Sequence, residues 1–338
     1  MSTQETSALP TPSVLSEPNF FQKAVKSQTA ILLFVLVVLY CYFGFRNNLF
    51  FSSGEASNLI TDFSGLVLLA IAETFVIISG GIDLSVGSTG AIAGVVGAEV
   101  MKHYSASWGL TQLLLLGTLV CAAVGTVVGV INALLITYIR LVPFVATLVT
   151  FSAGTGYALV VSGGGDVADV PGATIWSAKG FWHLTWLDLI ILIVMVGFCL
   201  VLRFTRFGRY TYAIGSNPFA ARAAGINMRR HIASIYVISG FLAGLVGMFF
   251  FIRLGAGSPT TGGTANLQAI ACVVIGGVAL TGGSGSVINP LLGCAILTIV
   301  GDGLIFINVQ PTWNQVVVGG IIALAVGVTG FSGVRSRR

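Results

Sequence analysis

Ten long apolar runs constrain the fold of this chain more than any other feature of its sequence. A helix that crosses a bilayer needs about 20 apolar residues, and hydrocarbon leaves the backbone no partners other than its own hydrogen bonds. Only 8% of the 338 residues are charged, whereas a soluble domain carries about 25%. The pattern predicts an all-α, polytopic transmembrane bundle of about ten spans, at residues 29–46, 58–79, 84–101, 108–138, 143–162, 186–203, 231–252, 266–281, 287–308 and 313–332.

Several of these runs depart from the length of an ordinary span. The runs 84–101 and 266–281 are short and rich in glycine, which predicts broken or half-spanning helices. The run 108–138 is long enough to tilt or to extend beyond the membrane. Glycines inside apolar runs, as in Gly90–Val100, predict closely packed helices. An eleventh span is the alternative to this count.

The positive charges predict how the bundle is oriented. Lys and Arg are enriched in the cytoplasmic loops of membrane proteins. If the N-terminus is cytoplasmic, most of the 16 Lys and Arg residues share its side, and the exceptions are Arg46, Lys102, Lys179 and Arg253. This places both termini in the cytoplasm. It predicts a disordered cytoplasmic tail at 1–28, a transmembrane domain at 29–332 with a cytoplasmic loop at 204–230, and a basic cytoplasmic tail at 333–338.

The sequence contains no motif that predicts enzyme chemistry. It has no G-x-x-x-x-G-K-[ST] loop for a nucleotide, no G-x-S-x-G elbow and no H-E-x-x-H. The five cysteines lie in apolar runs without a motif spacing, and the three histidines are far apart in the sequence. We therefore expect a protein that is not an enzyme, binds no metal or cofactor and has no nucleic-acid partner.

A weak internal similarity joins two glycine-rich segments. "IISGGIDLSVGS" (Ile77–Ser88) aligns with "VVIGGVALTGGS" (Val273–Ser284). Transporters are often built from repeats, with the binding site where glycine-interrupted helices meet. Glycine-rich segments also match by chance, so both interpretations stay open.

Four polar residues inside or beside the apolar runs are candidates for a translocation pathway: Glu73, Asp83, Asn132 and Asp302. A charged side chain at the bilayer centre costs about 2.5–3.5 kcal/mol on insertion scales, so such groups face the bundle interior or a wet cavity. The alternative for each is a packing role, and Asp83 could bind the helix amides around Val86. Acids within the membrane would also suit a proton-coupled carrier.

The loop 204–230 contains a short helix signal, "SNPFAARAAGI". Asn217 is expected to be the N-cap of this helix, Pro218 is expected in its first turn, and Gly225 is expected at its end. Spacing places Phe219, Arg222 and Ala223 on one face. An apolar anchor beside a cation suits a groove on a partner protein, and a helix lying on anionic lipid headgroups is the alternative.

Three segments together resemble one known family. "TFVIISGGIDLSVGS" (Thr74–Ser88), "FGRYTYAIGSNPFAARAAGI" (Phe207–Ile226) and "AIACVVIGGVALTGGSGS" (Ala269–Ser286) resemble permease subunits of bacterial ABC importers for simple sugars. These permeases include the ribose, xylose, arabinose and galactose group and belong to the branched-chain amino acid and simple sugar permease superfamily. The resemblance covers nearly the whole chain from about residue 30.

The resemblance implies partners, a location and a role for the cytoplasmic loop. A second permease subunit, identical or homologous, would complete a monosaccharide pathway through the bacterial cytoplasmic (inner) membrane and its lipid. Two ATP-binding subunits, or one tandem ATPase, would bind ATP and Mg, and an extracytoplasmic binding protein would deliver the sugar. The residues implied to couple this chain to the ATPase are Asn217, Pro218, Phe219, Ala220, Ala221, Arg222, Ala224 and Gly225.

The chain also departs from the family pattern. Acidic residues are frequent in the family where this chain has Pro218 and Phe219, and also where it has Asn266 and Gln268. These differences suit a specialised ATPase, a heterodimeric partner or a different substrate. The alternative functions are an ABC permease for a branched-chain amino acid, a nucleoside or a signalling furanose, and a stand-alone secondary carrier or channel.

Overall fold

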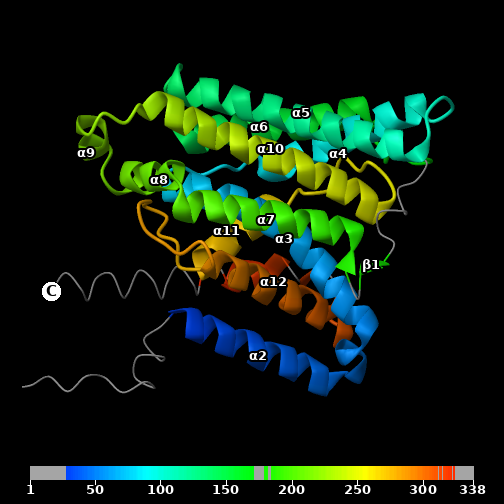
Figure 1. Ribbon diagram of the computed structural model, residues 1–338. Helices are drawn as coiled ribbons and strands as arrows, with labels where there is room; N and C mark the ends of the chain where they lie inside the picture. The colour runs from blue at the N-terminus through cyan, green and yellow to red at the C-terminus, as the bar shows by residue number, and fades with distance from the viewer. Residues whose placement is uncertain are drawn as a thin grey trace, which may run out of the picture.

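The computed structural model describes residues 28–170, 179–181, 184–310, 312, 313, 315–321 and 323. The described chain is a bundle of helices with one short antiparallel strand pair (Figure 1). In chain order the elements are α2 (Gln28–Arg46), the 3-10 helix η1 (Asn48–Phe51), α3 (Ser53–Ile78), α4 (Val86–Tyr104), α5 (Leu110–Thr137), α6 (Pro143–Val161), β1 (Lys179–Phe181), β2 (Leu184–Thr185), α7 (Trp186–Phe204), α8 (Arg206–Ser216), α9 (Pro218–Ala223), α10 (Met228–Leu254), α11 (Ala265–Ile275) and α12 (Asn289–Phe306).

Seven of the described helices are long and apolar enough to cross a membrane: α2, α3, α5, α6, α7, α10 and α12. The prediction of a polytopic helical membrane protein is therefore confirmed. Helix α5 has 28 residues, or about 42 Å of length, which confirms the prediction of a long run. The predicted span 313–332 lies largely outside the described residues, as do the predicted tails 1–28, apart from Gln28, and 333–338.

The two glycine-rich runs behave differently from each other. Helix α11 has 11 residues, or about 16 Å, so the short helix predicted within 266–281 is confirmed, while its half-spanning placement stays a prediction. Helix α4 is continuous for 19 residues, and the prediction of a broken helix within 84–101 is wrong. The interruption instead lies before it, at residues 79–85, because Gly80 adopts a φ of 88° that ends α3.

Helices α3 and α10 form the centre of the bundle. Both are largely buried, whereas α2, α5, α6 and α7 bury only a minor part of their residues. Figure 1 shows α2 beside α12 at one edge of the bundle and α5 at the opposite edge. Buried side chains of α3, α4 and α10 supply most of one continuous apolar core.

Glycine allows the central helices to touch backbone to backbone. A Cβ atom on Gly125 of α5 would lie 2.2 Å from the carbonyl oxygen of Gly240 on α10, closer than atoms can pack. The reverse substitution meets the same obstacle, at 2.3 Å from the carbonyl oxygen of Gly125. These glycines are packing residues of a membrane helix pair, as the sequence predicts.

The bundle has two distinct ends. Helices α8 and α9 lie at one end, here called the α9 end, and β1 lies at the opposite end, here called the β1 end (Figure 1). The first residues of α2 also lie at the α9 end, where the Thr29 hydroxyl donates to Asn289 at 2.8 Å. The side chain of Asn47, just after α2, donates to the Phe306 carbonyl at 3.0 Å at the β1 end.

Candidate functional site

Helix α9 is a short helix delimited by its own sequence. The Asn217 side-chain oxygen accepts hydrogen bonds from the amides of Phe219, at 3.1 Å, and Ala220, at 3.0 Å. Pro218 occupies the first turn, and Gly225 ends the segment with a φ of 82°. Each of these three predicted roles is confirmed. The helix has six residues, slightly under two turns.

The faces of α9 differ in exposure. Ala221 is buried and attaches the helix to its neighbours, whereas Phe219 is 85% exposed and Arg222 is also exposed. A large apolar side chain in water is costly. Phe219 and Arg222 thus form a small surface of an aromatic ring and a guanidinium at the tip of the α9 end.

Helix α8 connects α9 to the interior of the bundle. The end of α8 leaves no space for a side chain, because a Cβ atom on Gly215 would lie 1.8 Å from the Ile78 carbonyl oxygen. The Gly283 amide donates to that same oxygen at 2.8 Å. The Tyr212 hydroxyl also donates to the Gly285 carbonyl at 3.0 Å. Helix α8, which packs against α9, is therefore in direct contact with the end of α3 and with the loop after α11.

The two similar glycine-rich segments meet at this junction. Ile78 belongs to the first segment and Gly283 to the second, and a Cβ atom on Gly282 would lie 2.8 Å from the Gly80 Cα. Both segments interrupt helices, at the ends of α3 and α11. Their contact shows that the two interruptions are packed together under α8, while a common origin of the segments stays a prediction.

Asp83 and Asn132 belong to one buried hydrogen-bond network at the interruption between α3 and α4. Asp83 Oδ1 accepts from the amide of Ser85, at 3.0 Å, and from its hydroxyl, at 2.6 Å. Asp83 Oδ2 accepts from the Ser239 hydroxyl on α10 at 2.7 Å. Asn132 on α5 donates to Ser85 Oγ at 2.8 Å and accepts from Thr150 on α6 at 2.7 Å.

This network connects the segment before α4 to α5, α6 and α10. The predicted bond of Asp83 to a helix amide is made to Ser85, directly before α4, rather than to an amide within the helix. Sequence reasoning missed Ser85, Ser239 and Thr150. Hydroxyls beside an intramembrane acid were the available signal for Ser85, whereas Ser239 is 156 positions away from Asp83 in the sequence.

Glu73 lies close to this network but outside it. Its side chain is completely buried, and neither carboxylate oxygen has a hydrogen-bond partner among the described residues. It lies near enough to Asp83 for two ionised carboxylates to repel each other. The Tyr236 hydroxyl, directly against Gly81, also lacks a partner in the described part of the chain. These groups form a polar region in the centre of the bundle that its hydrogen bonds satisfy only in part.

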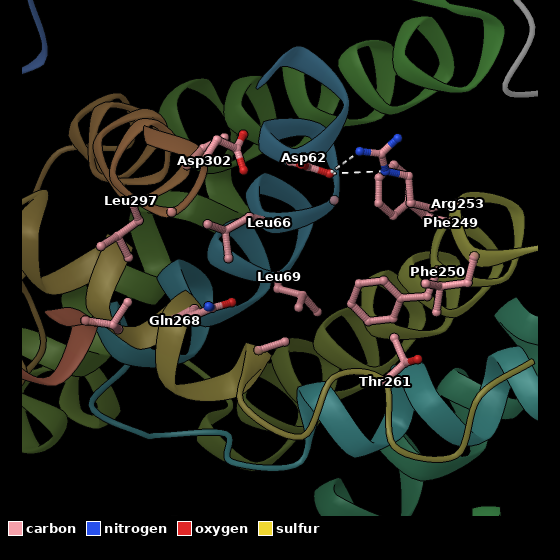
Figure 2. A pocket seen from close by; sticks show the side chains of 16 residues that line it. Asp62, Leu66, Leu69, Phe249, Phe250, Arg253, Thr261, Gln268, Leu297 and Asp302 are labelled. Atoms are coloured by element: carbon pink, nitrogen blue, oxygen red, sulfur yellow. Dashed lines mark hydrogen bonds and ion pairs between the residues drawn. The ribbon is translucent and has the colours of Figure 1, made fainter. Parts of the chain in front are cut away.

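Asp302 lies elsewhere, in a cavity of about 300 Å³ near the β1 end. Figure 2 shows side chains from α3, α10, α11 and α12 around this space, with Asp302, Asp62 and Gln268 on its sides. Arg253 on α10 makes an ion pair with Asp62 on α3 at 3.1 Å. Asp302 Oδ2 has no hydrogen-bond partner among the described residues.

The structure thus separates the four candidate pathway residues into two places. Asp83, Asn132 and Glu73 lie around the interruption between α3 and α4, and Asp302 lies at the β1 end. Sequence reasoning missed Asp62, although it lies inside a predicted span as Glu73 does. Within the described residues, no three His, Cys, Asp or Glu side chains gather as metal ligands.

Comparisons with known proteins identify the class to which this architecture belongs. The family described as "Branched-chain amino acid transport system / permease component" matches residues 55–326. The chain is 31% identical to the galactose/methyl galactoside import permease protein MglC of Escherichia coli (strain K12) over 318 residues, which is 90% of this chain and 94% of that protein. It is 32% identical to the ribose import permease protein RbsC of the same strain over 324 residues, 94% of this chain and 98% of the relative.

A third relative extends the range of sugars. The fructose import permease protein FrcC of Rhizobium meliloti is 31% identical over 314 residues, 89% of this chain and 85% of the relative. Because the family match spans most of the chain, the protein belongs to the branched-chain amino acid transport system permease family.

Proposed function

We propose that this chain is the transmembrane permease subunit of an ATP-driven ABC importer for a monosaccharide. The observation that carries the proposal is near-full-length similarity to import permeases named for galactose, ribose and fructose. The chain is a multi-pass protein of the bacterial inner membrane. It carries no catalytic activity of its own, and ATP and Mg bind to partner subunits.

The translocation pathway forms with a second permease subunit, identical or homologous. Two ATP-binding subunits, or one tandem ATPase, act at the cytoplasmic side, and an extracytoplasmic binding protein hands over the sugar. The chain has about ten spans with both termini in the cytoplasm, so the α9 end is cytoplasmic and the β1 end faces outward. The positive-inside pattern of Lys and Arg supports this orientation.

Helix α9 and its flanks, from Asn217 to Gly225, dock into the ATPase. Phe219 and Arg222 make the contact, which is supported by their exposure on a helix held by its own caps. The packing of Gly215 against Ile78 supports transmission of the movement to the two helix interruptions. Rigid-body motion of this kind underlies alternating access in transporters.

The four candidate pathway residues take different roles in this proposal. Asp302 lines an open cavity and contacts solute, whereas Asp83 and Asn132 hold α4, α5 and α10 together through Ser85. Glu73 faces the pathway in the state that opens the centre of the bundle, and its unpartnered carboxylate supports this role. Glu73→Gln would then slow uptake, and an unchanged uptake rate would assign Glu73 to packing instead.

Reconstitution tests the proposed function. Proteoliposomes with the chain, its ATPase and its binding protein should accumulate galactose, ribose or fructose only when ATP and the binding protein are both present. Leucine is the matched competitor, because the family description includes branched-chain amino acid transport. Accumulation of sugar by the chain alone, without a nucleotide-hydrolysing subunit, would overturn the proposal, and uptake of leucine in place of sugar would assign the alternative solute class.

A further inference from the structure

The cavity at the β1 end is built within a single chain. Its polar side chains come from α3 (Asp62), α10 (Arg253), α11 (Gln268) and α12 (Thr298 and Asp302), and Thr261 lies in the segment before α11. The three consecutive helices α10, α11 and α12 and the distant helix α3 therefore direct polar groups to one space. Polar residues within membrane helices are costly in hydrocarbon and commonly mark a substrate pathway or binding site.

The charges and donors of the cavity define the chemistry of its ligand. Arg253 uses two of its nitrogens on Asp62, at 3.2 Å and 3.1 Å, and keeps further N–H donors available. Asp302 supplies a carboxylate to the lining of the cavity, and Gln268 supplies both a donor and an acceptor. A sugar hydroxyl both donates and accepts, so it fits a mixed set of this kind. Two carboxylates against one guanidinium disfavour an anionic solute.

Apolar side chains complete the lining of the cavity. Phe250 and Phe249 on α10 and Leu66 and Leu69 on α3 lie beside the polar groups (Figure 2). A pocket that combines apolar walls with a few directed polar groups is typical of small-molecule sites. Its volume of about 300 Å³ is at the lower end of the roughly 300–1,000 Å³ range of ligand pockets, which suits a single sugar ring.

We propose that this cavity is a monosaccharide-binding site within each permease subunit, in which Asp302 and Gln268 bind sugar hydroxyls. The proposal rests on the proposed function, because the orientation of the bundle places the β1 end outward. The sugar would enter beside the Asp62–Arg253 pair, whose side chains are 37% and 39% exposed, and pass from there toward the bundle centre. The site would select among sugars after release from the binding protein.

A protection experiment tests occupancy directly. Thr261→Cys, in the lining of the cavity but not at a proposed sugar contact, is introduced into the full complex together with Cys41→Ser and Cys199→Ser. Cys41 and Cys199 are partly exposed, whereas Cys121, Cys272 and Cys294 are buried. A membrane-impermeant maleimide applied from outside should modify the introduced thiol. Galactose, ribose or fructose, whichever the importer transports, should slow the modification roughly tenfold or more, and leucine should not. A modification rate that saturating transported sugar leaves unchanged would overturn the proposal.

An uptake experiment tests the contact made by Asp302. Asp302→Asn should lower the uptake rate of the transported sugar by roughly tenfold or more. It should have little effect on the deoxy analogue that lacks the hydroxyl bound by Asp302, so the ratio of the two rates changes. Asp166→Asn is the matched control, because Asp166 is an exposed acid outside the cavity, in the segment that bridges to Gly257 beyond α10.

The two experiments separate the site from the overall function. If Asp302→Asn lowers the uptake rates of the transported sugar and of its deoxy analogue by the same factor, Asp302 has a structural role and the proposed contact is overturned. Wild-type uptake that depends on ATP and on the binding protein would leave the proposed function intact in that case. If the wild-type complex transports no sugar, the proposed function fails before the site is tested.

Discussion

Helix α9 and the network around Asp83 are both polar features of an apolar protein, but they are built in opposite ways. Helix α9 is exposed, and its main contacts are made by neighbours in the sequence, such as the Asn217 cap. The Asp83 network is buried and joins residues of α5, α6 and α10 to the segment before α4. The difference is that α9 leaves Phe219 and Arg222 exposed, whereas the network joins helices of this chain to one another.

The largest effect on stability is expected for Asp83→Ala. The change removes the acceptor of three hydrogen bonds and leaves the hydroxyl of Ser239 buried without this partner. We expect the free energy of unfolding to fall by about 2–5 kcal/mol, since bonds to charged groups contribute about 1.5–3 kcal/mol each in water-soluble proteins and less in membranes. Thermal unfolding of the purified chain in detergent measures the change.

Two further variants calibrate that experiment. Ser239→Ala removes one of the three bonds and should cost correspondingly less, and Asp166→Ala changes an exposed acid and should cost little. An Asp83→Ala chain as stable as the original would contradict the role of these hydrogen bonds in holding the helices together.

Gly215→Ala tests the junction between α8 and the end of α3. The added methyl group would overlap the Ile78 carbonyl oxygen, so the backbone has to move. We expect a loss of about 1–3 kcal/mol in stability and a fall in uptake per ATP hydrolysed. Gly197→Ala on α7 is the control, because no atom lies within 4 Å of its added Cβ. If the two variants transport the same amount of sugar per ATP hydrolysed, the contact of α8 with the end of α3 does not transmit the movement.

Asn217→Ala tests the cap of α9. Removal of an N-cap costs about 1 kcal/mol, which is large for a helix of six residues. The amides of Phe219 and Ala220, which donate to Asn217, should exchange their hydrogens faster with solvent, while the unfolding temperature of the bundle stays nearly unchanged. Asn217→Asp retains the acceptor and should restore slow exchange; failure of that rescue would contradict the capping role.

Arg222→Glu is expected to have the smallest effect on stability and a complete effect on function. Arg222 is exposed, so the free energy of unfolding should change by no more than about 0.5 kcal/mol. Reversed charge at the proposed ATPase contact should nevertheless abolish uptake and copurification of the ATPase. Arg206→Glu on α8 makes the same change at another exposed site. Normal uptake by Arg222→Glu would contradict the proposed docking role and favour the alternative, in which α9 lies on lipid headgroups.

The same contrast explains which parts of the candidate site could be predicted from the sequence. The bounds of α9 follow from Asn217, Pro218 and Gly225, because caps act over three or four residues. The position of Asp83 beside an interruption was visible in its glycines, yet its partner Ser239 was not, since no local pattern points from one to the other. The short helix within 266–281 was predicted correctly, whereas the interruption expected within 84–101 lies before α4.

The sequence by itself determined that this is a helical membrane protein with a capped helix in a basic loop. Run length, charge bias and caps are local properties, and the bilayer imposes helices on any long apolar segment. Only the tertiary structure decided which polar residues meet. It joined Asp83 to Asn132 through Ser85 and placed Asp302 in the cavity with Asp62 and Arg253. The packing of helices through glycine contacts determines which polar residues come into contact. The sequence does not reveal which helices become neighbours.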